Sequence, residues 1–364
     1  MNKEVISDKQ GISLIVLFII GESSILVMGL EAEKDLWLAI ILAIFMALPI
    51  MAVYSKIHYL FPHKDFFDII EFCFGRFISK AIIVLFTWYM IDLTSLILRD
   101  FGNFIKTVSL PETPIIIIMM SLIILCIWAV KEGTEVMGRW AEFFLPIVII
   151  VMFSIVLLLI PNMNINNIRP VLYNGINPVV KGAFGPLSIP FVETVSFTMA
   201  FSKFKTQKSP YKVYIIGLLL GGIILLMTSL TNTLVLGINS SLTLHYPSYS
   251  TVKKINIGEV LQRLEALVAL VFMLGGFIKI SITLLAACKG FTRIFGYNHY
   301  QFIVTPIALF ILNLSYFEFD SVMDYMEWNK GIYPYYAFPF QVIFPIVIWG
   351  IAEIKKKRLA NQFK

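Results

Sequence analysis

Ten apolar runs follow one another along this chain, each long enough to cross the hydrocarbon core of a membrane. A spanning helix needs about 20 apolar residues. Only 14% of the residues are charged and the mean hydropathy is +0.83, whereas soluble domains carry about 25% charged residues. The sequence therefore predicts one all-α integral membrane domain over residues 1–364 with ten transmembrane helices. The runs lie at 11–31, 36–60, 80–106, 113–131, 139–160, 178–202, 211–237, 258–288, 300–316 and 334–352.

Charge and motif content exclude several other classes of protein. The net charge of +6 comes from basic residues in short loops between apolar runs, with no basic stripe and interleaved aromatics, so no nucleic-acid partner is expected. The three cysteines are far apart and form no Cys-x-x-Cys pair, and the four histidines have no metal-ligand spacing. No Walker loop or dinucleotide fingerprint occurs. We therefore expect no cofactor, no metal and no enzyme activity, with membrane lipids as the surroundings.

The distribution of basic residues predicts the orientation. An even number of spans places both termini on one side. Segments on the side of the N-terminus include a run at 203–212 with four lysines and the tail at 355–358 with three lysines and an arginine. The opposite side includes the acidic segment 318–327. Since basic residues concentrate on the cytoplasmic side, both termini are predicted to be cytoplasmic.

Between spans two and three, the segment 65–74 has an amphipathic pattern. Phe66, Phe67, Ile70 and Phe74 share one helical face, opposite Asp68 and Glu71. This pattern predicts a short helix lying in the membrane interface.

Two of the apolar runs are interrupted near their middles. The first contains Gly21-Glu22-Ser23-Ser24, and the sixth runs from Gly185 and Pro186 through Ser188 to Pro190. Matched interruptions in corresponding positions are typical of transporters built from inverted repeats. We therefore predict interrupted helices 1 and 6 in two five-helix repeats, residues 1–160 and 161–364. The alternative is that the prolines only kink a continuous helix.

The two interruptions predict a ligand site. A half-helix that begins after each break would offer free N–H groups and a positive dipole end to an anionic group, such as an amino-acid carboxylate. Charged residues within spans are costly and often functional. The candidate ligand-binding residues are Gly21, Glu22, Ser23, Tyr89, Asp92, Gly185, Pro186, Ser188 and Glu193, with Lys279 as a further charge within a span. The alternative for the charges is structural pairing, or protonation of the carboxyl groups.

Several segments of the chain resemble a known family. They are Ile6-Ser7 with Gln10, Gly21, the segment 167–172 (Asn-Ile-Arg-Pro-Val-Leu) with Gly175 and Pro178, Glu193 and Phe197, Arg263 and Glu265, and Lys279 and Ser281. In these segments the chain resembles the B subunit of Ger-type spore germination receptors. This is the spore germination permease family, within the amino acid–polyamine–organocation transporter superfamily. The stretch around Arg169-Pro170 is the most specific part.

This resemblance implies a nutrient-sensing subunit in the spore inner membrane. Its small-molecule germinant, expected to be an amino acid, would bind between helices one, three, six and eight, and its partners would be a receptor A subunit and a C lipoprotein. In sodium-coupled relatives of this fold a cation sits between helices one and eight. Lys279, with Ser281 nearby, would replace that cation or gate the site, pairing with carbonyls at Gly21 or with Glu22. Glu22-Ser23 departs from the small neutral residues expected there. The alternative function is a proton-coupled amino-acid transporter, which sequence does not separate from a sensor.

Overall fold

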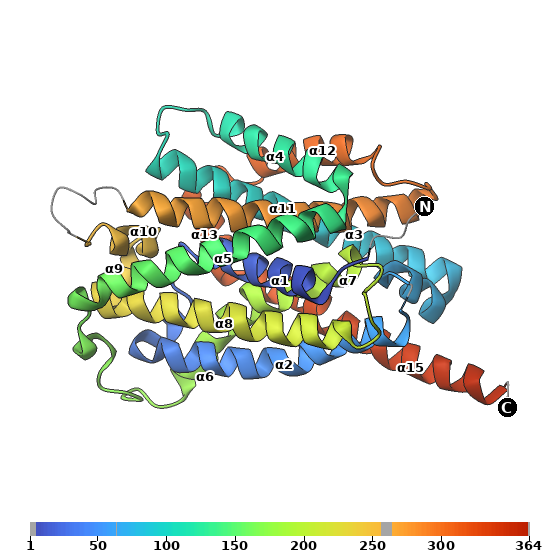
Figure 1. The fold of residues 1–364 in the computed structure, drawn as a ribbon, viewed down its shortest axis with the longest axis horizontal. Helices are drawn as coiled ribbons and strands as arrows, with labels where there is room; N and C mark the ends of the chain where they lie inside the picture. Colours follow the sequence, from blue (N-terminus) through green and yellow to red (C-terminus); the bar gives the residue numbers. More distant parts are fainter. Residues whose placement is uncertain (1–4, 63, 256–263, 363–364) are drawn as a thin grey trace.

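A computed structural model describes residues 5–62, 64–255 and 264–362, apart from the side chains of residue 22 and residues 359–362. Helices run along one common direction in a single bundle (Figure 1). The longer helices are α1 (Asp8–Ser23), α2 (Leu36–Leu60), α3 (Phe66–Val108), α4 (Ile115–Glu132), α5 (Thr134–Leu159), α6 (Asn177–Pro186), α8 (Ser209–Leu236), α11 (Glu265–Phe295), α12 (Val304–Phe317), α13 (Val322–Gly331) and α15 (Phe344–Gln362). The shorter ones are α7 (Ser196–Ala200), α9 (Ile238–Thr243), α10 (Pro247–Val252) and α14 (Tyr333–Phe338).

Within the described residues, seven helices are long and apolar enough to cross a membrane, or eight if the bent pair α12 and α13 forms one span. The first and sixth predicted spans are not among these helices, because neither forms one long continuous helix. Helix α1 has only 16 residues, and the sixth span is divided among α6, α7 and the irregular turns between them. The prediction of a membrane protein is thus confirmed, while the count of ten spans stays a prediction.

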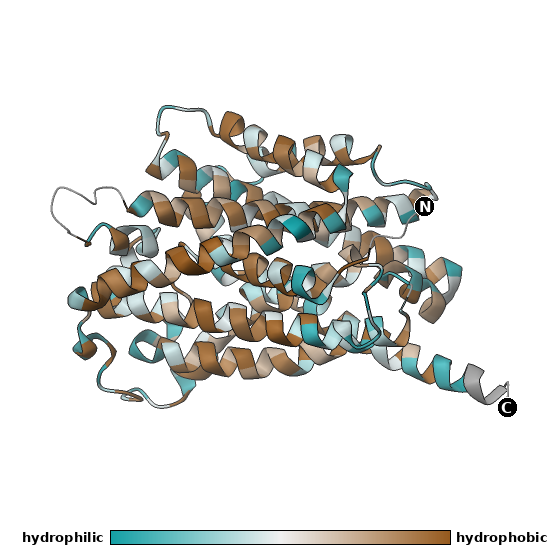
Figure 2. Ribbon diagram, viewed as in Figure 1, coloured by the Kyte–Doolittle hydropathy of each residue, from teal (hydrophilic) through white to brown (hydrophobic). Residues whose placement is uncertain are grey.

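The surface and the two chain ends agree with a membrane location. Apolar residues cover the middle of the helices, and hydrophilic residues gather at helix ends and connections (Figure 2). Large apolar side chains face outward, including Phe77, 92% exposed, and Phe143, 67% exposed. The start of α1, the end of α15 and the connection from α7 to α8 lie at the same end of the bundle (Figure 1). An even number of crossings predicts this arrangement.

Helix α1 forms the centre of the bundle. It begins with a capping box between Ser7 and Gln10, and it packs against α5, α8 and α11. Every residue from Leu14 to Ile20 is at most 1% exposed. A helix surrounded by other helices needs no polar face, which explains why this run is apolar on all sides.

The break in the first span lies just beyond its predicted position. Helix α1 continues to Ser23, and the chain is non-helical from Ser24 to Gly29 before a 3₁₀ turn, Leu30–Asp35. The half-helix predicted to begin directly after this break is therefore absent, and that prediction is wrong. Gly29, at φ 75°, takes the left-handed conformation that reverses the chain toward α2.

The sixth span is unwound and not merely kinked. After α6 the chain forms a wide turn over Leu187–Phe191, in which Ile189 has extended angles of φ −128° and ψ 116°. A tight 3₁₀ turn, Val192–Val195, then leads into α7. Pro190 has no N–H to donate, and this favours the loss of helical hydrogen bonds here. The prediction of an interruption in this span is confirmed.

Gly75 divides the long helix α3 into two parts. Its φ of 72° is positive, which glycine adopts readily and which stops the first segment after Phe74. In that segment Phe66 and Phe67 are buried, while Asp68 and Glu71 form ion pairs with Arg293 near the end of α11. The predicted helix is therefore present, and its polar face forms ion pairs with α11. Its location in the membrane interface stays a prediction.

Candidate ligand site at the interrupted helices

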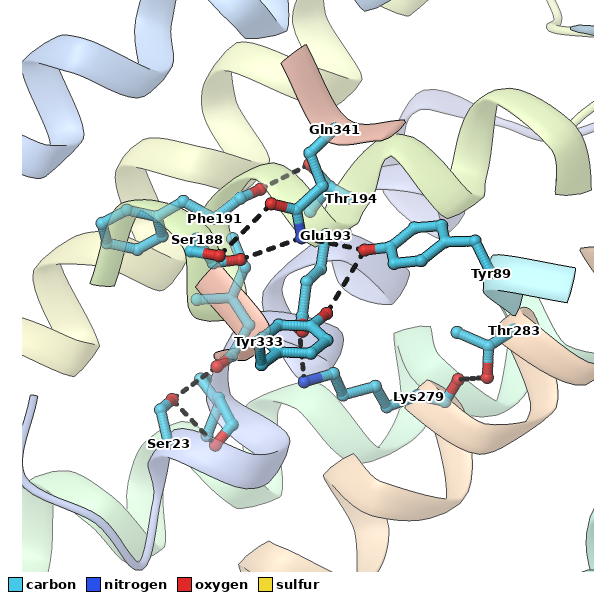
Figure 3. Close-up of polar contacts among 12 residues, drawn as sticks. Ser23, Tyr89, Ser188, Phe191, Glu193, Thr194, Lys279, Thr283, Tyr333 and Gln341 are labelled. Carbon is cyan, nitrogen blue, oxygen red and sulfur yellow. Dashed lines mark hydrogen bonds and ion pairs between the residues drawn. The ribbon is translucent and has the colours of Figure 1, made fainter. Parts of the chain in front are cut away.

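A buried ion pair joins the unwound part of the sixth span to α11. The Lys279 ammonium lies 2.6 Å from the Glu193 carboxylate, and the two side chains are 0% and 1% exposed. Figure 3 shows the two side chains end to end, one from the turn that precedes α7 and one from the middle of α11. An unpaired charge would be costly in a water-free interior, so each of these two charges stabilises the other.

A chain of hydrogen bonds extends from Glu193 to two further helices. Tyr333 at the start of α14 donates to the Glu193 carboxylate at 2.6 Å. The Tyr333 hydroxyl lies 3.2 Å from the hydroxyl of Tyr89 in α3, and the Gln341 amide donates to the Tyr89 hydroxyl at 2.9 Å. Figure 3 shows these groups converging on one point from α3, the sixth span and the last span. Hydrogen bonds therefore connect the ion pair, which itself involves α11, to α3 and to the last span.

Gln341 also holds the unwound backbone. Its amide donates to the Ser188 carbonyl at 3.2 Å, and its own carbonyl oxygen accepts from the Ser188 hydroxyl at 3.3 Å. Tyr54 of α2 donates to the Val192 carbonyl at 3.1 Å and to the backbone carbonyl of Gln341. Unwinding a helix exposes backbone groups that must find partners inside a membrane. Side chains from α2 and from the last span supply several of them here.

The end of α1 lies beside the same site. The Ser23 hydroxyl donates to the carbonyls of Ile19 at 2.5 Å and Ile20 at 3.2 Å, and the Ser24 hydroxyl donates to Gly21 at 2.9 Å. The Lys279 ammonium lies 5.3 Å from the ring centre of Phe18. Lys279 thus lies between α1 and the sixth span, with its carboxylate partner in the sixth span. The side chain of Glu22, predicted to bind ligand, lies outside the described part of the chain.

Two glycines from the predicted site have different surroundings. A Cβ atom on Gly21 would lie 2.7 Å from the backbone carbon of Gly275, so α1 and α11 cross with glycine against glycine. A Cβ on Gly185 would meet only Glu31, at 3.8 Å. Gly21 is therefore needed for close packing of two helices. Gly185 has room for a side chain. Pro186, also predicted to bind ligand, is buried at the end of α6.

Asp92 and Ser281 lie away from the ion pair. Asp92, one turn beyond Tyr89 in α3, faces Glu318 and Tyr336. Glu318 itself accepts a hydrogen bond from Ser95. The Ser281 hydroxyl lies beside the Cys126 thiol of α4. Of the predicted residues, the structure therefore groups Tyr89, Ser188, Glu193 and Lys279 in one network, next to the end of α1.

Sequence reasoning missed Tyr333, Gln341 and Tyr54. It searched the spans for charges and interruptions, and these three side chains are neutral. Gln341 nevertheless carried a signal, because it is an amide within the apolar run Ala337–Ile343 and is 0% exposed. Such a residue needs hydrogen-bond partners inside the bundle.

Sequence comparison places the chain among spore germination proteins. The family described as "Spore germination protein" matches residues 5–321. The chain is 30% identical to "Spore germination protein KB" of Bacillus subtilis (strain 168) over 98% of its own length and 97% of the relative's. It is 24% identical to "Putative spore germination protein YfkT" of the same organism over 89% of each chain.

The fold is that of a known transporter structure. A solved structure of Mhp1, a nucleobase–cation symport-1 family transporter in a closed conformation with bromovinylhydantoin bound, superposes with a TM-score of 0.62. The match covers 89% of this chain and 74% of the transporter at 12% sequence identity. This similarity establishes a transporter-like arrangement of helices.

Proposed function

The chain belongs to the spore germination protein family, and from this premise we propose that it is the germinant-sensing subunit of a spore germination receptor. Its germinant is an amino acid, and its site is the network around Glu193 and Lys279. It acts in the spore inner membrane with an A subunit and a C lipoprotein. The chain has ten spans in two repeats, 1–160 and 161–364, with both termini cytoplasmic.

The buried ion pair is the observation that carries this proposal. An amino acid presents a carboxylate and an ammonium group a few ångströms apart, the same two charges that Glu193 and Lys279 present to each other. Its carboxylate can pair with Lys279 and its ammonium with Glu193. Neither buried charge is then left alone, so the exchange avoids the large cost of breaking a buried pair.

A ligand that separates Glu193 from Lys279 would change the arrangement of the helices. Lys279 belongs to the long helix α11, whereas Glu193 belongs to the unwound turn held by Tyr333 and Gln341 from the last span. A ligand between the two charges must move the turn relative to α11, and Tyr333 moves with its carboxylate. A ligand shifts such an equilibrium only by binding one arrangement better than the other, and the separated pair is the arrangement that favours a zwitterion.

The competing function is transport. The similarity to Mhp1 favours it, since a transporter-like bundle also has a central site at interrupted helices. In purified protein reconstituted into vesicles, a sensor binds radiolabelled amino acid to saturation without accumulating it. A transporter accumulates it in proportion to vesicle volume, and accelerates when a proton gradient is imposed.

The binding test uses a panel of radiolabelled amino acids and purified protein. We expect saturable binding that is lost in both Glu193→Gln and Lys279→Met, because each variant removes one of the two charges that a zwitterion requires. Lys289→Met is the matched control, since Lys289 holds Ala200 and Ser202 near the start of the α7–α8 connection. Undiminished binding in both site variants would contradict the proposal.

A further inference from the structure

A cavity of about 640 Å³ lies at the C-terminal end of α3. The end of α3, the start of α4, the end of α12 and the connection from α12 to α13 line it, and it is open to the surface. Its volume falls within the range of about 300–1,000 Å³ that is usual for small-molecule sites. Asn103, which lines it, is 14 residues beyond Tyr89 in the same helix, a rise of about 21 Å. The cavity is therefore separate from the network around Glu193.

Hydrogen-bond donors from α3 form one wall of this cavity. Arg99, Asn103 and Lys106 follow one another at spacings of four and three residues, which places them on one helical face. Asn103 is 3% exposed, and its amide nitrogen has no hydrogen-bond partner among the described residues. Buried donors are rarely left without a partner, and a ligand in the cavity is one source of the missing acceptor.

Arg99 also has a donor atom without a partner among the described residues. Two of its nitrogens donate to the carbonyls of Ser315 at 3.1 Å, Tyr316 at 3.0 Å and Phe319 at 2.8 Å, which holds the end of α12. Its Nε, which is also buried, has no partner in the described part of the chain. The ammonium of Lys106 adds a positive charge on the same wall. An anionic oxygen group, such as a carboxylate, would satisfy all three donors.

The connection from α12 to α13 contributes a negative charge to the cavity. Asp320 lines it and acts electrostatically on Arg99. Ser321, which follows, is already used as the cap of α13, since its hydroxyl accepts from the Asp324 amide at 3.1 Å. The cavity therefore combines donors and positive charge from α3 with a carboxylate from the connection, and this combination suits a zwitterion.

We propose that this cavity is a second ligand site, which binds the α-carboxylate of a free amino acid through Asn103, Arg99 and Lys106 and its ammonium through Asp320. With the predicted orientation, the cavity opens on the side opposite the termini, where germinant arrives. The claim that the cavity binds an amino acid is independent of the proposed function. Only the identity of this amino acid with the germinant rests on the proposed function.

The test uses a cysteine introduced at Thr107, which lines the cavity and is exposed, whereas Cys73, Cys126 and Cys288 are buried. The rate of modification by a methanethiosulfonate reagent is measured in detergent with and without glycine or L-alanine. We expect a saturable slowing of at least about three-fold by the amino acid. Methylamine and acetate, each with one of the two charges, should slow it less at equal concentration.

Two variants and two controls complete the design in the Thr107→Cys background. Asn103→Leu and Lys106→Gln should each reduce the apparent affinity for the amino acid, by about ten-fold for the buried donor and about three-fold for the exposed charge. Lys254→Gln, which removes an exposed charge elsewhere, should leave it unchanged. Binding of radiolabelled amino acid to Glu193→Gln reports on the central site separately from the cysteine assay, so that failure of the central site and failure of this one are distinguishable.

The competing occupant is a zwitterionic phospholipid headgroup. Protection of the cysteine in phosphatidylethanolamine nanodiscs without amino acid, and insensitive to added amino acid, would assign the cavity to lipid and overturn the proposal. Absence of protection by amino acid in detergent would also overturn it. Protection that both variants leave intact would show that the α3 wall does not bind the ligand.

Discussion

The ion pair between Glu193 and Lys279 makes a quantitative prediction about stability. Removing one partner of a buried pair takes a close counter-charge from the other and costs about 3–5 kcal/mol, whereas replacing both with uncharged groups of similar volume is often neutral or stabilising. Both side chains are at most 1% exposed, so water cannot take the place of the missing partner. Glu193→Gln and Lys279→Met should therefore each destabilise the protein, and the double variant should regain most of the loss.

The expected size can be expressed as a melting temperature. With an unfolding entropy of about 2.1 cal/mol/K per residue, a loss of about 3–5 kcal/mol in this chain of 364 residues lowers the melting temperature by about 4–7 °C. Thermal unfolding in one detergent, followed by the loss of monodisperse protein, would give values for the parent and the three variants. The coupling free energy of the double-mutant cycle should be at least about 2 kcal/mol.

Two outcomes would refute this reasoning. If the losses of the two single variants add in the double variant, the two charges do not stabilise each other. If neither single variant is destabilised, the site admits water and the charges are not in a dry interior. Ligand binding provides an independent readout, because the double variant should recover stability without recovering affinity for an amino acid.

Three further predictions concern packing, topology and ions. Gly21→Ala should destabilise by about 1–3 kcal/mol because its Cβ would lie 2.7 Å from the Gly275 backbone, whereas Gly185→Ala should be tolerated, and equal melting temperatures would contradict this. Cysteines at the exposed positions Lys254 and Lys205 should be labelled from outside and from the cytoplasm respectively, and the reverse pattern would overturn the orientation. Binding of amino acid should not require sodium, because the Lys279 ammonium already supplies a cation between Phe18 of α1 and the unwound turn. Sodium-dependent binding by the unaltered protein would exclude this role.

Much of the architecture was predictable because, in a membrane protein, hydropathy along the sequence is nearly sufficient to locate the spanning helices. The apolar runs at 36–60 and 113–131 match α2 and α4 to within about two residues. In lipid, a single segment can satisfy its backbone hydrogen bonds only by forming a helix. The interruption of the sixth span was equally readable, because Pro186 and Pro190 remove two helical donors from one short stretch. The first break was harder, since Gly21 is also compatible with a helix, and the chain in fact leaves the helix after Ser23.

The sequence by itself determined that this is a helical membrane protein with charges at its interrupted spans, because the cost of burying polar groups depends mainly on residue type. Tertiary structure alone decided which groups meet. It paired Lys279 with Glu193, 86 positions away in the chain, and brought Tyr333 and Gln341 to the same point. It also assigned Gly21 to a helix crossing with Gly275. Such choices depend on helix rotation and crossing, which the packing of side chains between helices sets and which hydropathy along one helix does not encode.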